Sequence, residues 1–173
     1  MTPLLVLHRL GDEGGATAWR TALEAGGWNG EWDASDLPGH DYFDPADLVM
    51  AALHTSRGIE WAEPPLVVAV GSQFVVAQLL ALAGRASGIV LVDVPPILDV
   101  DPDESQRLQY DWLRRVADDP GRPRGLPPFT DAPFWASQRA AIRVPALELP
   151  DNAPGDVLAT VRDWWGDVTA AQR

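Results

Sequence analysis

The chain has 173 residues, 46% of them hydrophobic, and a formal net charge of −12 at pH 7. This length and apolar content predict one domain over residues 1–173, and the acidity argues against nucleic acid or an anionic membrane as a partner. Cysteine and lysine are absent, which excludes disulfides, thiolate sites, Schiff bases and lysine-dependent phosphate loops. No signal peptide or apolar run of about 20 residues is evident, so we expect a cytoplasmic protein that does not enter the membrane.

The first part of the chain alternates strand and helix patterns. An uninterrupted apolar run predicts a strand over Pro3–Leu7. A helix is expected over Ala16–Gly26, where a glycine pair is a stop signal. Trp28–Ala34 is a weaker strand pattern. A further helix is predicted over Asp44–Gly58, with an N-cap aspartate followed by proline.

The central unit, Pro65–Ala83, carries the strongest pattern. Leu66–Val70 is wholly apolar, as in a strand buried on both faces of a parallel sheet. Gly71 interrupts this run, and Phe74–Leu82 is then apolar enough for a buried helix. Ligands bind outside the carboxyl ends of the strands in such sheets. We therefore expect any chemistry near Gly71, Ser72 and Gln73.

The rest of the chain continues the alternation. Ile89–Val92 is a predicted strand that Asp93 follows, and a fifth run lies near Leu147. Between them, residues 98–140 are acidic and proline-rich, with a helix expected over 104–117. An amphipathic helix is predicted over Gly155–Val168. The alternation predicts an α/β three-layer sandwich with a mostly parallel five-stranded sheet.

The sequence VAVGSQFVVAQLLALA, residues 68–83, resembles the strand, nucleophile elbow and helix of the α/β-hydrolase superfamily. Aligned on the first glycine of G-x-S-x-G, Gln73 takes the nucleophile position and Val75 replaces the second glycine. A register with Ser72 as the nucleophile would instead put Val70 and Phe74 at the two glycine positions, where a close backbone approach needs small residues.

Two further segments extend the resemblance. Residues 8–15, HRLGDEGG, are similar to the H-G-x-G-x-x-G segment that helps to form the oxyanion hole, with Arg9 in place of glycine. Residues 36–41, DLPGHD, resemble a loop that is mainly architectural in the family and that contains His40. The resemblance implies strand order 2-1-3-4-5, a reduced hydrolase core and a short cap over 98–140. The positions that it implies for an oxyanion hole or ligand are Arg9, Leu10, Phe74 and His40.

The Ser-His-acid triad of a hydrolase is not intact in this chain. The family's base comes last in chain order, yet His8, His40 and His54 all precede Gln73. The positions at the degenerate site are Gln73, Ser72, His8 and Asp93. We expect a non-hydrolytic protein that binds a small apolar or acyl ligand, or a partner protein, in the old crevice.

The alternative is an enzyme with rewired or residual chemistry, such as an esterase, lyase or isomerase acting on a small ester or acyl substrate. In that case the same crevice would supply an acid, a base or an anion clamp. No cofactor is expected, and no metal, because the histidines lack ligand spacing. A homodimer stays open as a mode of assembly.

Overall fold

The computed structural model describes residues 2–9, 15–37, 54–55, 58, 60–93 and 141–172. In this part of the chain five strands form one parallel sheet in the order β2-β1-β3-β4-β5. Their bounds are β1 (Leu4–Arg9), β2 (Trp32–Leu37), β3 (Leu66–Val70), β4 (Gly88–Val92) and β5 (Ala146–Leu149). The α/β class, the parallel sheet and the strand order predicted from the sequence are confirmed.

Three longer helices flank the sheet. They are α1 (Gly15–Ala22), α3 (Phe74–Leu82) and α6 (Pro154–Ala171). The helix α1 continues into a wider-turned segment, η1 (Leu23–Gly27), and Gly26 within it takes a φ of 94°. A glycine adopts this left-handed conformation without the clash that a β-carbon would cause. The predicted stop signal therefore lies where the helical backbone ends.

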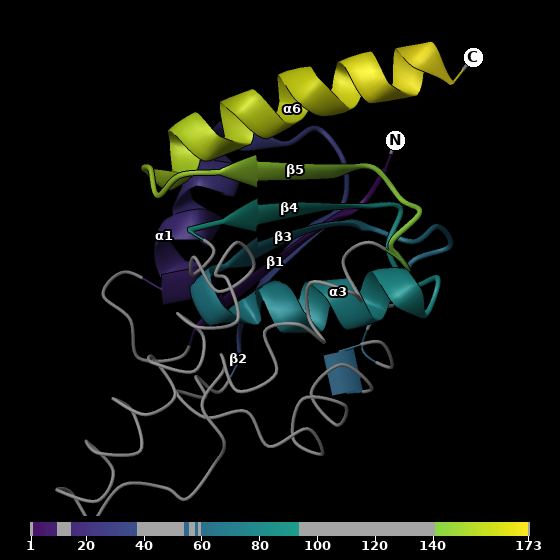
Figure 1. Cartoon of the computed structure of the whole chain (residues 1–173). Helices are drawn as coiled ribbons and strands as arrows, with labels where there is room; N and C mark the ends of the chain where they lie inside the picture. The colour runs from purple at the N-terminus through teal and green to yellow at the C-terminus, as the bar shows by residue number, and fades with distance from the viewer. Residues whose placement is uncertain are drawn as a thin grey trace, which may run out of the picture.

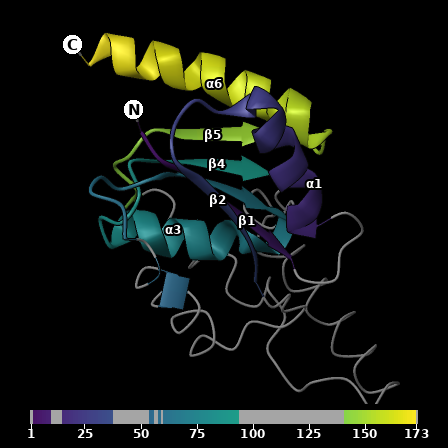
Figure 2. The ribbon, with the colours of Figure 1, turned by 180° about the vertical axis from the view of Figure 1, so that it is seen from behind.

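The strands carry a separate apolar core on each face. In β1, Leu5 and Leu7 pack into the cluster around α3, whereas Leu4 and Val6 pack into the cluster of α1 and α6. This alternation follows from the two-residue period of side chains along a strand. Figures 1 and 2 show the resulting three layers, with α3 on one side of the sheet and α1 and α6 on the other.

The central unit matches its prediction residue for residue. The strand β3 covers Leu66–Val70, the short 3-10 turn η2 covers Gly71–Gln73, and α3 covers Phe74–Leu82. The edge strand β2 begins at Trp32 and not at Trp28 as expected. Trp28 lies before the strand, and its Nε1 donates a hydrogen bond to the carbonyl oxygen of Thr2 at 3.0 Å.

Two predicted features lie outside the described residues. They are the cap over 98–140, with its helix at 104–117, and most of the helix expected over residues 44–58. Among the helices that the structure does describe, none combines the length and the apolar character that crossing a bilayer requires.

Candidate functional site at the carboxyl edge of the sheet

The chain order of the sheet creates a switch point between β1 and β3. The chain leaves β1 toward α1 on one face, and leaves β3 toward α3 on the other. Connections that diverge in this way open a crevice at the carboxyl ends of the two strands. His8 and Arg9 at the end of β1, and Gly71 after β3, therefore lie at the edge where the sequence predicted the site.

The turn after β3 has its one unusual backbone angle at Gly71, where φ is 57°. Gln73 has ordinary helical angles, with φ −72° and ψ −5°. A nucleophile elbow holds its serine on a strained turn. Here the residue with the left-handed backbone is Gly71, which has no side chain and therefore cannot act as a nucleophile.

Three of the predicted site residues are largely enclosed. Gln73 is 4% exposed, Phe74 is 0% exposed and His8 is 9% exposed. Phe74 belongs to the core cluster around α3, where it anchors the first turn of that helix. In the register of β1 and β2, His8 is paired with Asp36, the first residue of the DLPGHD segment.

Asp93 is the predicted site residue that the structure leaves exposed. It follows β4 directly, has a φ of 52°, and its backbone N–H donates to the carbonyl oxygen of Leu149 at 3.0 Å. Asp93, Glu148, Leu149 and Pro150 line a cavity of about 290 Å³ between the ends of β4 and β5. Two acidic residues thus line one cavity at this part of the carboxyl edge.

His8 lies in β1 and Asp93 directly follows β4, and these two strands are not neighbours. The strand β3 runs between β1 and β4, so two interstrand spacings separate them, about 10 Å between backbones. A ligand in contact with both residues would have to lie across the end of β3, over the turn at Gly71 and Gln73. Among the described residues, this edge therefore includes the imidazole of His8, the buried amide of Gln73 and the exposed carboxylates of Asp93 and Glu148.

Several predicted positions cannot be placed. Leu10 and His40 lie outside the described residues, and the side chains of Arg9 and Ser72 are likewise outside the description. Among the residues that are described, no group of three or more acidic or histidine side chains gathers as a metal site requires.

Sequence reasoning missed Glu148 as a neighbour of Asp93. The two residues come together because β5 pairs with β4 so that Leu149 lies beside Val92. The available signal was the position of Glu148 near the end of a predicted strand, but only the register brings it to Asp93. No family model matches this chain, and no curated protein matches its sequence.

Proposed function

We propose that this chain is a non-hydrolytic protein with a reduced α/β-hydrolase core, which binds a small apolar or acyl ligand, or a partner protein, at the carboxyl edge of its sheet. The observation that carries the proposal is the turn after β3. Its left-handed position is Gly71, and its motif-aligned position is Gln73, whose amide is not a nucleophile. No histidine follows either residue in the sequence.

Hydrolysis by this chain would lack the base that activates a serine. A serine hydroxyl is a weak nucleophile until an adjacent base accepts its proton. In a serine protease the loss of nucleophile or base alone lowers turnover about a million-fold. With the family's late histidine absent from the chain order, even Ser72 would lack the usual partner, which supports binding rather than hydrolysis.

The test compares hydrolysis with binding in the same preparation. We expect no turnover of p-nitrophenyl acetate above background and no labelling by a fluorophosphonate, in the wild type or in Ser72→Ala. A series of straight-chain carboxylates is then titrated into wild type and Gln73→Ala. We expect saturable binding of one chain length, with an affinity that Gln73→Ala changes at least about fivefold. Fluorophosphonate labelling that Ser72→Ala abolishes would contradict the proposal.

The second candidate is rewired chemistry, and Asp93 is the observation that favours it. A non-glycine residue with positive φ is uncommon, and such strain gathers at functional sites. Asp93 also lines the 290 Å³ cavity together with Glu148, and paired carboxylates can serve as acid and base in lyase or isomerase chemistry. An activity lost in both Asp93→Asn and Glu148→Gln, on any ester or acyl substrate tested, would favour this candidate over simple binding.

A further inference from the structure

The helix α6 is too long for the sheet that it covers. Its 18 residues span about 27 Å, whereas strands of 4 to 6 residues span about 13 to 20 Å. The helix begins at the carboxyl edge of the sheet and runs back against the strand direction (Figure 1). Its last turns therefore project past the amino edge, where both views place the N-terminus beside them (Figures 1 and 2).

A cavity of about 530 Å³ lies under this projecting end of α6. Its helical wall is formed by Arg162, Trp165, Gly166 and Thr169, whose spacing of three and four residues places them on one face of the helix. The opposite wall comes from segments that precede the strands, among them Trp28, Asn29 and Glu63. The volume is in the range of small-molecule sites, and the cavity lies at the edge opposite to the site proposed above.

Two indole rings from different elements line the cavity, and both are held in place by the fold. The Nε1 of Trp28 donates to the carbonyl oxygen of Thr2 at 3.0 Å. The six-membered ring of Trp165 fits over Gly88, where a β-carbon would lie 2.7 Å from Cζ3. Rings fixed in this way offer flat apolar walls at little further entropic cost, as a planar aromatic ligand requires.

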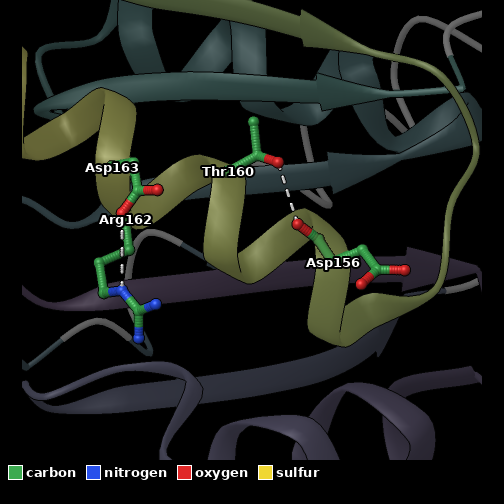
Figure 3. A network of polar contacts seen from close by, with 4 residues as sticks. All are labelled: Asp156, Thr160, Arg162 and Asp163. Carbon is green, nitrogen blue, oxygen red and sulfur yellow. Dashed lines mark hydrogen bonds and ion pairs between the residues drawn. The ribbon is translucent and has the colours of Figure 1, made fainter.

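Arg162 and Trp165 each bring N–H donors to the walls of the cavity. Trp165 is 8% exposed, and among the described residues its buried Nε1 has no hydrogen-bond partner. The guanidinium of Arg162 makes one ion pair in the described structure, to the neighbouring Asp163 at 4.0 Å, and Figure 3 shows that both residues belong to α6. Five N–H donors on that group leave capacity for a carboxylate.

We propose that the cavity binds a small planar aromatic molecule that carries one carboxylate, with its ring against Trp28 and Trp165 and its carboxylate at Arg162. The net charge of −12 does not prevent this, because charges beyond about 8 Å are screened at physiological ionic strength. Glu63 is the one acidic residue among those that line the cavity, so its removal should strengthen the binding of an anion.

The experiment titrates three probes that share a ring and differ in charge: indole-3-acetate, indole and tryptamine. Calorimetry gives the affinities, and the indole N–H resonances of ¹⁵N-labelled protein, with Trp165→Phe to assign one of them, locate the binding. We expect indole-3-acetate to bind with a Kd below about 1 mM, more tightly than indole, and tryptamine most weakly. An equal or reversed order among the three, or no binding, would overturn the proposal.

Four variants separate the cavity from the rest of the surface. Arg162→Gln should weaken indole-3-acetate binding about fivefold or more, and Glu63→Gln should strengthen it. A β-carbon at either Gly166 or Gly155 of α6 would meet open space, but only Gly166 lines the cavity. Gly166→Leu should therefore abolish binding and Gly155→Leu should preserve it, with far-UV circular dichroism confirming both folds. Equal affinity in these two variants would refute the assignment, and it would leave the proposal for the opposite edge unaffected.

Discussion

Gly88 and Trp165 are in such close contact that the first residue of β4 can only be glycine while the ring keeps its place. A β-carbon at Gly88 would lie 2.7 Å from Cζ3 and 3.1 Å from Cη2 of Trp165, and 3.0 Å from Cδ1 of Leu66. The contact fixes the position of α6 over the amino end of the sheet, because Trp165 is one of the buried residues of that helix. The missing β-carbon of Gly88 thus makes room for the ring that places α6, one of the two described helices on that face of the sheet.

We expect Gly88→Ala to destabilise the protein by about 1–3 kcal/mol, because the extra carbon overpacks a full core. Urea unfolding measures the change. In a Trp165→Leu background, which removes Cζ3 and Cη2, the same substitution should cost at least about 1 kcal/mol less. Additive effects in this double-mutant cycle would show that the ring is not what the new carbon meets.

The sequence predicted the central elements well for a physical reason. Leu66–Val70 and Phe74–Leu82 are uniform apolar segments that one glycine separates, and burial on both sides leaves few alternatives for such segments. The edge strands were less predictable. The strand β2 contains Asp33 and Ser35 and is partly exposed, so it lacks the apolar run that marks a central strand.

The candidate sites depend on features that no local pattern encodes. Asp93 and Glu148 line one cavity because of the β4–β5 register. The left-handed backbone at Asp93 is a φ angle of the fold and has no signal in the sequence. The cavity under α6 arises because that helix extends past the sheet and because the fold brings Trp28 and Trp165 together, although they are far apart in sequence. Sequence reasoning located the carboxyl edge from the strand–turn–helix unit alone, since that unit is local.

Gln78 is a buried amide in the middle of α3. It is 0% exposed, and neither its Nε2 nor its Oε1 has a hydrogen-bond partner in the part of the chain that the structure describes. An unsatisfied buried amide costs free energy that an apolar side chain of the same shape does not. Gln78→Met, which keeps an unbranched chain, should raise the free energy of unfolding by about 1–2 kcal/mol.

The matched control for that change is Gln172→Met, which makes the same substitution at an exposed position beside the end of α6. It should change stability by less than about 0.5 kcal/mol. Denaturant unfolding of the three proteins gives both values. If Gln78→Met instead lowered the free energy of unfolding by more than about 1 kcal/mol, the amide of Gln78 would have a stabilising hydrogen-bond partner.

The turn after β3 should tolerate substitution at Gly71 only at the cost of backbone strain. A β-carbon there would meet nothing within 4 Å, but the φ of Gly71 is 57°. A side chain at this position would therefore lower the stability through backbone strain and not through a clash with neighbouring atoms. Gly71→Ala should destabilise by about 1–2 kcal/mol, and Gly71→Asn by less, because asparagine visits this region more readily. Thermal unfolding measures both. As a control, Gly166→Ala inside α6 should stabilise by about 0.5–1 kcal/mol, and an equal gain in Gly71→Ala would contradict the left-handed turn.

Asp93 allows its backbone role and its charge to be separated. With a φ of 52°, the residue sits where asparagine and glycine are tolerated and alanine is strained. Asp93→Asn and Asp93→Gly should therefore leave the free energy of unfolding within about 0.5 kcal/mol, whereas Asp93→Ala should lower it by about 1 kcal/mol. If the carboxylate serves the cavity that it shares with Glu148, Asp93→Asn and Asp93→Gly should change ligand affinity or turnover equally, despite full stability. A ligand response that follows the stability order of the three variants would instead assign Asp93 a purely structural role at the end of β4.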